Sequence, residues 1–462
     1  MSETLYDELY RPQFHFSSRK NWINDPNGLV YYDGEYHLFF QHNPDGLQWG
    51  NMTWGHAVSP DLLHWTQLDH ALYPDSWGTM FSGSAVVDWN NTAGFQTGKE
   101  KTLVAIYTLH RSADVDSSIE DQCIAYSNDR GRTWTKYAGN PVLPTPHLVN
   151  RGFRDPKVFW HGPTGKAASN SSERMAGKWV MIIYHRAGNS LYGSPDLKSW
   201  KLLSEFTGLP YECPDMYELP VDGDPADTRW IAEGGNGDHF VGRFDGTTFT
   251  PESEKLTCDY GLHYYASQTF SDIQASDGRR IQIAWMSSGN SPGMPFTNQM
   301  SFPHELTLVA TPAGIRMVRK PVREIETIRG REWKFENLTL NPGENPLAGI
   351  EGELLEIHAT IEVGAAAKVG LRLRDESIRY STADHRLRCL GRNAPLEAKD
   401  GVLDLRILLD RASIEIFADG GLVTMASCFL PEPNDRSLEI YAKGGKAKIV
   451  SLNVWELKST WR

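Results

Sequence analysis

Residues 22–28 read WINDPNG and run directly into the apolar residues 29–32, LVYY. Polar and turn-forming residues therefore stand immediately before a strand-like run, which places Asp25 at the mouth of a strand. Pro26 fixes its own φ and favours an extended backbone at Asp25, and Asn27 with the following glycine is a turn signal. Taken alone, the pattern fits an Asx-turn that leads into a strand.

Two further acidic residues have the same local setting. Asp155 lies in RDPKVF, residues 154–159, and Glu212 lies in ECPDMY, residues 212–217. In each case the acid stands one or two residues before a proline, and a hydrophobic strand follows. Three acids at strand mouths indicate a shared site.

An apolar strand recurs through the first two-thirds of the chain, as in TLVAIY at 102–107 and WVMIIY at 179–184. Several repeats close on an aromatic residue after a turn, namely SPDLLHW at 59–65, SNDRGRTW at 127–134 and SPDLKSW at 194–200. Helical periodicity is almost lacking between these units. The closing tryptophans Trp65, Trp134 and Trp200 are interpreted as packing residues.

The repeats number five, each of about four strands. Their first strands begin near Gly28, Ser84, Asp155, Pro214 and Tyr264. This pattern predicts an all-β chain whose residues 1–322 form a five-bladed β-propeller. The first strand of each blade lines the central channel, so the three acids should converge at one end of it. A parallel β-helix is the competing repeat fold, but its repeats are shorter and more uniform.

The pattern changes after a charged connector at residues 323–332. From residue 333 to 462 the strands alternate with period two, as in LLEIHATI at 354–361 and KVGLRLR at 368–374. Such alternation, broken by Gly, Asn and Asp turns, predicts an antiparallel β-sandwich. Because no acid cluster stands at a strand mouth here, we expect a structural domain, with glycan binding as the alternative.

Composition limits the kind of ligand. The 462 residues carry a net charge of −12, which argues against a nucleic-acid partner. No apolar run approaches the roughly 18 residues that a membrane span needs, so no membrane partner is expected. The 15 Trp, 18 Tyr and 18 Phe suit an all-β fold, and they also suit a carbohydrate binder, because sugar C–H faces pack on aromatic rings.

The five cysteines are scattered, odd in number and free of C-x-x-C spacing. They are interpreted as free thiols in a reducing compartment. Residues 1–8 are acidic and lack the apolar stretch of a signal peptide. The prediction is a cytoplasmic protein, with a secreted and already trimmed form as the alternative. The oligomeric state is left open, a dimer being one option.

Seven motifs occur in order along nearly the whole chain: WINDPNG (22–28), FFQHNP (39–44), WGNMTWGH (49–56), FSGS (81–84), FRDP (153–156), ECPD (212–215) and DRASIEIF (410–417). By these motifs the chain resembles glycoside hydrolase family 32, the levanases, exo-inulinases and invertases that cleave β-fructosides. So many ordered matches are highly specific.

The resemblance implies a role for each acid: Asp25 is the nucleophile, Glu212 the acid/base, and Asp155 the residue that holds fructose hydroxyls and stabilises the transition state. It also implies a set of substrate-binding residues, namely Asn24, Gln41, Trp49, Ser82 and Arg154, with Phe81 where plant relatives carry a tryptophan and Asp259 at a position nearer the leaving group. Trp49 is expected to be a wall of the pocket.

The departures from the family pattern lie after Trp285. The chain has Ser288–Gly289 where many levanases and inulinases have Asn-Trp, Thr297–Asn298 where they have Trp-Arg, and His304 where they have Arg. These changes predict an altered aromatic rim around the pocket. We therefore expect activity on sucrose or short fructo-oligosaccharides to be at least equal to that on long polymer.

Retaining hydrolysis of a glycoside needs two carboxyl groups about 5–5.5 Å apart, one ionised and one carrying a proton. Asp25 suits the first task and Glu212 the second, and Arg154 is expected to keep Asp155 ionised. No cofactor or metal is expected, and isolated histidines such as His42 and His56 are interpreted as structural residues.

The expected function is a retaining exo-β-fructosidase that acts on terminal non-reducing β-D-fructofuranosides of sucrose, fructo-oligosaccharides, inulin or levan. Exo cleavage is expected because a channel closed at its base admits only a chain end. A fructosyltransferase on the same scaffold and a catalytically silent fructan-binding propeller are the alternatives. The three intact acids favour the hydrolase.

Overall fold

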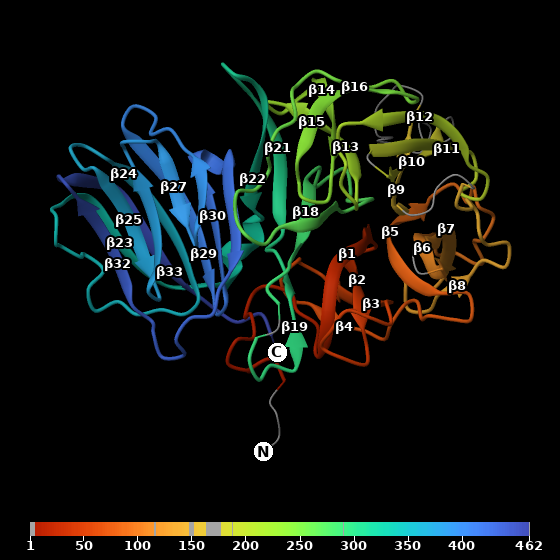
Figure 1. Ribbon diagram of the computed structural model, residues 1–462, viewed down its shortest axis with the longest axis horizontal. Coiled ribbons are helices and arrows are strands. Elements are labelled where there is room, and N and C mark those ends of the chain that lie inside the picture. The colour runs from red at the N-terminus through yellow and green to blue at the C-terminus, as the bar shows by residue number, and fades with distance from the viewer. Residues whose placement is uncertain are drawn as a thin grey trace.

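The computed structural model in Figure 1 describes residues 5–114, 117–146, 152–162, 177–186, 188–289 and 291–461. Among these residues the regular elements are β-strands, apart from two 3-10 helices, η1 (Arg323–Ile328) and η2 (Asp419–Gly421). The prediction of an all-β chain is confirmed. None of the helices in the described ranges is long and apolar enough to cross a membrane.

The N-terminal part forms four sheets around a common centre (Figure 1). The first has the order β19-β1-β2-β3-β4, made of β19 (Phe296–Thr297), β1 (Asn21–Tyr32), β2 (Glu35–Asn43), β3 (Thr53–Ser59) and β4 (Thr66–Gln67). The second contains β5 (Thr79–Asp88), β6 (Thr102–Asp114), β7 (Ser117–Ser127) and β8 (Thr135–Lys136). The third contains β9 (Phe153–His161), β10 (Lys178–His185), β11 (Gly188–Ser194) and β12 (Lys201–Thr207).

The fourth sheet has nine strands and combines two of the expected repeats. It contains β13 (Asp215–Val221), β14 (Asp224–Glu233), β15 (His239–Phe244), β16 (Phe249–Pro251), β17 (Tyr265–Thr269), β18 (Arg280–Met286), β20 (Gln299–Met300), β21 (His304–Thr311) and β22 (Gly314–Pro321). One parallel pair, Val221 with Leu308, joins β13 to β21. The pairing therefore gives four sheets, and the prediction of five separate blades is not established by it.

The turns that end at Trp65, Trp134 and Trp200 have the same local structure. The indole Nε1 of Trp65, Trp134 and Trp200 donates to the carbonyl three residues earlier, at 2.9, 3.0 and 3.0 Å. In each turn a serine hydroxyl also donates to the aspartate two residues later. The repeated sequence thus encodes a repeated turn, with the tryptophans in the packing role predicted for them.

Polar side chains tie the first strands of the repeats together near the centre. Gln268 of β17 accepts from the Leu29 amide of β1 at 3.1 Å and donates to the Gly83 carbonyl of β5 at 3.0 Å. The Nζ of Lys157 in β9 donates to the Thr269 carbonyl at 2.5 Å. Since Lys157 also pairs with the buried Asp215 of β13 at 3.3 Å, all five first strands are linked across the centre.

The C-terminal part consists of two antiparallel sheets. One contains β23 (Arg329–Leu340), β33 (Ala447–Leu457), β24 (Leu355–Glu362), β29 (Val402–Asp410), β30 (Ser413–Ala418) and β31 (Val423–Cys428). The other contains β28 (Arg392–Pro395), β27 (Arg386–Cys389), β26 (Glu376–Ser381), β25 (Lys368–Leu373) and β32 (Leu438–Lys443). Ile357 and Ile416 of the first share one buried core with Leu371 and Ile440 of the second, the arrangement of a β-sandwich. The predicted connector, residues 323–332, contains η1 and the start of β23.

Buried ion pairs join the two parts. The ring of His15 lies between two carboxylates of the sandwich, with Nδ1 2.7 Å from Asp410 and Nε2 2.6 Å from Glu415. His304 of β21 approaches the second oxygen of Glu415 at 2.8 Å. We call His15, His304, Asp410 and Glu415 the interface cluster. It explains why the motif at 410–417 carries two acids within strands of a sandwich.

Candidate active site

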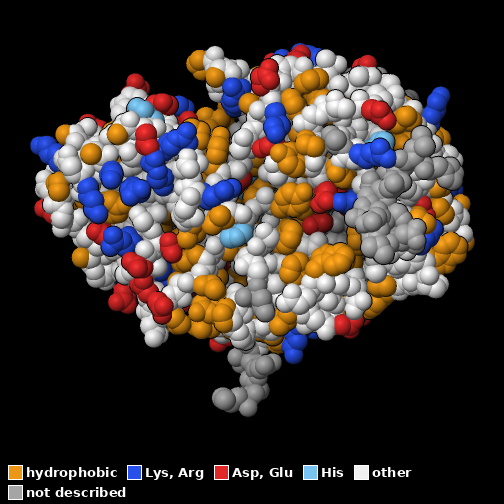
Figure 2. All heavy atoms as spheres, viewed as in Figure 1, with side chains coloured by type: hydrophobic (Ala, Val, Ile, Leu, Met, Phe, Trp, Pro, Cys, Tyr) orange, Lys and Arg blue, Asp and Glu red, His pale blue; other side chains and the backbone are white. Residues whose placement is uncertain are grey.

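A pocket of about 460 Å³ opens among the first strands of the N-terminal sheets. Nine of the ten predicted site residues line it, namely Asn24, Asp25, Gln41, Trp49, Phe81, Ser82, Arg154, Asp155 and Glu212. Near the centre of these sheets, Figure 2 shows acidic and basic side chains side by side, with hydrophobic side chains around them. The three acidic segments identified from the sequence thus meet in one hollow, although Asp25 lies inside β1 (Asn21–Tyr32) and not at its mouth.

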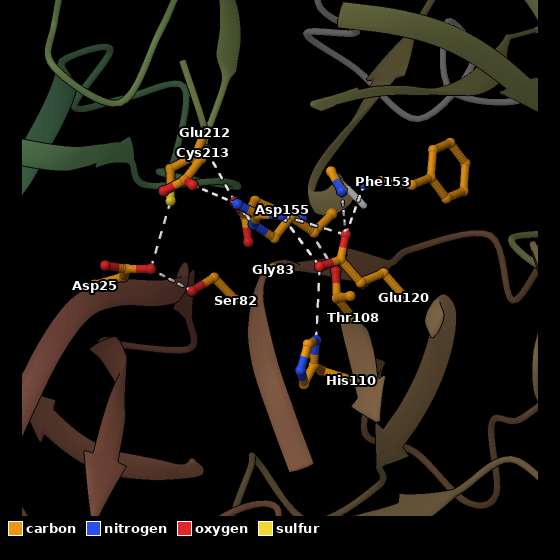
Figure 3. Close-up of polar contacts among 12 residues, drawn as sticks. Asp25, Ser82, Gly83, Thr108, His110, Glu120, Phe153, Asp155, Glu212 and Cys213 are labelled. Carbon is orange, nitrogen blue, oxygen red and sulfur yellow. Dashed lines mark hydrogen bonds and ion pairs between the residues drawn. The ribbon is translucent and has the colours of Figure 1, made fainter. Parts of the chain in front are cut away.

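Asp25 lies within β1 and is held by three donors. Its Oδ2 accepts from the Ser82 hydroxyl at 2.5 Å and from the Cys213 thiol at 3.5 Å, and its Oδ1 accepts from the Asn24 amide at 3.0 Å. The indole of Trp22 fixes Asn24 in turn, at 2.8 Å. Burial raises the pKa of Asp25, and the three donors oppose that rise. The carboxylate is therefore oriented in the pocket, as Figure 3 shows for its contacts with Ser82 and Cys213.

Asp155 has a strained backbone, with a φ of 62° that is rare for a residue with a Cβ. Its amide donates to the Thr108 hydroxyl at 3.0 Å, and its Oδ2 accepts from the Cys213 amide at 3.1 Å. Cys213 is strained as well, with a φ of 51°. Because the Cys213 thiol also reaches Asp25, this one residue connects the two acids (Figure 3).

The pKa of Asp155 is shifted against the prediction that Arg154 keeps this acid ionised. Burial raises the pKa of its carboxyl to about 8, and the Asp25 and Glu212 carboxylates add to the rise, against the lowering effect of Arg154. The guanidinium of Arg154 interacts with three acids. Its Nε lies 3.7 Å from the Asp155 carboxylate, while its two Nη atoms contact Glu120 and Glu212. One positive charge shared among three acids does not compensate for burial.

Glu212 is the most accessible of the three acids, with 41% of its side chain exposed. Its Oε1 accepts from Arg154, and the Tyr265 hydroxyl lies 3.5 Å from its Oε2. Glu212 thus lines the pocket and is at the same time accessible to solvent.

Glu120 of β7 was missed by the sequence analysis. This buried carboxylate accepts from the amides of Gly152 and Phe153 at 2.9 and 2.7 Å and from Arg154 at 3.1 Å. Burial raises its pKa, but His110, Arg154 and the Phe153 amide together lower it to about 2. Glu120 is therefore a fixed anion that holds Arg154 against Glu212.

Two family models match the chain, the "Glycosyl hydrolases family 32 N-terminal domain" over residues 15–321 and the "Glycosyl hydrolases family 32 C terminal" over residues 324–456. The chain belongs to glycosyl hydrolase family 32. The family places this protein among the glycoside hydrolases, and the predicted resemblance is confirmed.

Known relatives cover the family 32 chain from end to end. A levanase of Bacillus subtilis is 44% identical over 99% of this chain and 72% of the relative. An extracellular exo-inulinase of Aspergillus ficuum is 32% identical, over 99% and 96% of the two chains. The crystal structure of exo-inulinase from Aspergillus awamori aligns with a TM-score of 0.87 at 31% identity, over 99% and 100%. A fructofuranosidase from Schwanniomyces occidentalis complexed with fructose gives 0.85 at 27%, over 99% and 100%.

Asp259 is the predicted residue that does not line the family 32 pocket. Its Oδ1 accepts from the Gly261 amide at 2.7 Å and from the Ala426 amide of β31 at 2.9 Å. The carboxylate thus connects the catalytic part to the sandwich. The sequence does not indicate the contact with Ala426, because Asp259 and Ala426 lie 167 positions apart.

Most of the departures from the family pattern after Trp285 do not lie at the edge of the pocket, as had been predicted. Thr297 is buried and donates to the Leu47 carbonyl at 2.9 Å, and Asn298 is buried and donates to the Ile23 carbonyl at 2.7 Å. His304 lies in the interface cluster. Only Ser288–Gly289 of these departures is partly or fully exposed. These positions therefore give little support to the expected preference for sucrose or short fructo-oligosaccharides.

Seven pocket residues had not been predicted: Met52, His110, Ser112, Ser118, Glu120, Tyr265 and Trp285. Most lie inside strands or next to them, without the turn and proline that mark the three acids. Among the residues that the structure describes, no group of three or more His, Cys, Asp or Glu side chains is arranged to hold a metal ion.

Proposed function

We propose that this glycoside hydrolase is a retaining, exo-acting β-fructosidase that releases terminal non-reducing β-D-fructofuranosyl units from sucrose, fructo-oligosaccharides, inulin or levan. The observation that carries the proposal is the meeting of Asp25, Asp155 and Glu212 in one pocket. The names of the relatives, levanase and exo-inulinase, and the fructose complex of the Schwanniomyces enzyme support this substrate class.

In the proposed mechanism an Asp25 oxygen attacks the anomeric C2 of the fructosyl unit while Glu212 donates its proton to the leaving oxygen. The C2–O bond breaks, and a fructosyl ester forms on Asp25. Glu212, now ionised, takes a proton from water, whose oxygen attacks C2 and releases Asp25. Two displacements at C2 retain the β configuration.

The donors around Asp25 serve this chemistry. Ser82, Asn24 and the Cys213 thiol all donate to it, which favours the ionised nucleophile and opposes the effect of burial. Arg154 keeps Glu212 beside the pocket, and Glu120 keeps Arg154 in place. Asp155, with its raised pKa, is suited to hydrogen-bond fructose hydroxyls as donor or acceptor.

Exo action is supported by the closure of the centre below the pocket. Gln268 and Lys157 cross between first strands at the centre, which supports a pocket closed at its base that admits the end of a chain. An early digest of inulin and levan should give fructose as the only small product. A ladder of oligosaccharides before fructose would refute exo action.

Retention is tested by proton NMR of the first-formed product. Initial β-fructofuranose is expected, and initial α-fructofuranose would refute the role of Asp25 as nucleophile. The same digest on concentrated sucrose separates hydrolysis from transfer, because kestose as the main product would identify a fructosyltransferase.

We also propose that the N-terminal part is a five-bladed propeller of residues 1–322, joined by a connector at 323–332 to a sandwich of residues 333–462. Its fourth blade would be β13–β16, and its fifth β17, β18, β21 and β22. The single residue pair between β13 and β21 supports counting the nine-stranded sheet as two blades. The five free cysteines support a reducing, cytoplasmic location.

A further inference from the structure

Three aromatic side chains are exposed in the segment between Trp49, which lines the pocket, and Gly78. In the described part of the chain, the aromatic residues exposed over more than half of their surface are Trp49, Tyr73 and Trp77, at 58, 54 and 61%. All three lie within residues 49–77, although aromatic residues occur throughout the sequence. We call these three residues the aromatic rim. A group of solvent-exposed aromatic side chains is typical of a binding surface.

Trp77 stands on a turn that is held in place. The backbone of Asp75 and Gly78 is paired in both directions, at 3.1 and 3.2 Å, and the Asp75 carboxylate accepts from the Trp77 amide at 2.7 Å. A Cβ at Gly78 would lie 2.3 Å from the His110 carbonyl, so only glycine lets the turn approach β6 this closely. The indole is therefore displayed on a positioned turn and not on a loose loop.

The outer end of the same segment is also anchored. The Nζ of Lys136 in β8 donates to the Tyr73 carbonyl and to the Asp75 carboxylate, both at 2.7 Å. Because β8 is the outermost strand of the sheet β5–β8, residues 73–78 run across that sheet from its inner strands to its outer edge.

The inner end of the rim reaches the pocket. The Trp49 ring lies edge-on to Phe81 at 6.0 Å, and Phe81 stacks flat on His110 at 4.0 Å. Phe81 and His110 both line the pocket, and Gly78 lies directly over the backbone of His110. Trp49 thus reaches the pocket wall, and Trp77 stands on the turn whose Gly78 touches the backbone of the pocket residue His110. The carbonyl of Tyr73 lies against β8, and its ring packs on His70 at 5.3 Å.

We propose that the aromatic rim is an accessory binding surface for the fructosyl units that follow the terminal one, with Trp77 as its central platform. This inference rests on the proposed function, since it supposes that the pocket holds the terminal fructosyl unit. Sugar C–H faces pack on exposed rings, and a track of aromatics suits a chain of neutral sugars. The rim then decides how well the enzyme distinguishes fructan chains from sucrose, whose two units end close to the pocket.

The test compares kcat/KM on inulin, levan, nystose and sucrose for the wild type, Trp77→Ala, Trp77→Phe and Tyr73→Ala. Trp77→Ala should lower kcat/KM on polymer about tenfold, through KM, and on sucrose less than twofold. Tyr73→Ala should act in the same direction and more weakly. Trp77→Phe should recover most of the loss, because a ring is restored.

A matched control is Leu202→Ala, which removes an exposed apolar side chain on β12 and should leave the polymer-to-sucrose ratio unchanged. If Trp77→Ala lowered kcat/KM equally on polymer and sucrose, or on neither, the proposal that the aromatic rim binds fructan would be overturned. A wild type that releases no fructose from any of the four substrates would overturn the proposed function itself, before any variant is compared.

A binding measurement removes the dependence on turnover. In native gels cast with inulin or levan, Asp25→Asn should be retarded, and Asp25→Asn with Trp77→Ala should be retarded clearly less. Equal retardation of the two proteins would overturn the proposal. Retardation by only one polymer would support the rim and identify the linkage that it accepts.

Discussion

Asp25 and Asp155 of the pocket and Asp410 and Glu415 of the interface cluster have pKa values shifted in opposite directions. In the pocket, burial raises the pKa of Asp25 and of Asp155, the latter to about 8. In the interface cluster, burial acts in the same direction, but His15 and His304 more than offset it and lower the pKa of Glu415 to about 2. Asp410 is lowered as well, where His15 and the Gln13 amide outweigh burial.

The difference lies in the partners. Each oxygen of Glu415 faces a histidine, and Glu415 also accepts from the Phe302 amide at 2.7 Å. In the pocket the acids are surrounded by other acids, and Arg154 divides its charge among three of them. Burial alone therefore does not distinguish a structural acid from a catalytic one; the charge of the neighbours does.

The largest effect is expected at Asp25 and Glu212, the proposed nucleophile and the proposed acid/base. Asp25→Asn and Glu212→Gln should each lower kcat at least about 1,000-fold, because the proposed mechanism has the first form a bond and the second transfer a proton. The melting temperature should not fall, since the uncharged amides relieve repulsion among the acids. Near-wild-type turnover of Asp25→Asn with fructosides would break the assignment.

The next effect concerns the interface cluster. Glu415→Gln removes the charge shared by His15 and His304 and should lower the free energy of unfolding by about 3 kcal/mol. Specific activity per folded molecule should remain close to that of the wild type. Urea unfolding followed by Trp fluorescence measures the free energy of unfolding, and initial rates on sucrose measure the specific activity. A large loss of kcat without a loss of stability would contradict the division into two regions.

A smaller effect is expected at Glu120, which belongs to the pocket but has a lowered pKa like the interface acids. Glu120→Gln should lower kcat about 10- to 30-fold with little change in KM, because Arg154 loses its fixed anion and holds Glu212 less well. The acidic or basic limb of the pH–rate profile should shift, which a purely structural role would not produce. Glu120→Asp should recover part of the activity.

The last effect is a difference in the sign of the pH dependence of stability. The folded pKa of Asp155 is raised from 3.8 to about 8, so its contribution to stability is present below pH 3.8 and is lost as the pH rises through 8. For Glu415, lowered from 4.5 to about 2, the contribution is present above pH 4.5 and is lost as the pH falls through 2.

Melting curves from pH 3 to 9 test these opposite signs. The melting temperature of Asp155→Asn minus that of the wild type should increase as the pH rises. The deficit of Glu415→Gln should be full near pH 6 and shrink toward pH 3. Two difference curves with the same slope would show that the regions do not differ as described.

Much of the site followed from local patterns. Asp25 and Asp155 were predicted at strand mouths because a proline next to an acid, followed by an apolar run, has few possible conformations. The aromatic closers were predicted for a similar reason, since each turn is specified within seven or eight neighbouring residues. Glu120 could not be found in this way: it lies inside β7, and its partner Arg154 is 34 positions away.

By itself, the sequence determined the strands, the all-β fold, the family and the three acids, because each depends on residues that are neighbours in the chain or on an ordered set of motifs. Only the tertiary structure decided the opposite pKa shifts of Asp155 and Glu415, that Asp259, Asn298 and His304 lie away from the pocket, and that Trp77 is exposed. These properties depend on burial and on contacts between residues far apart in the chain, and a local pattern does not encode either of them.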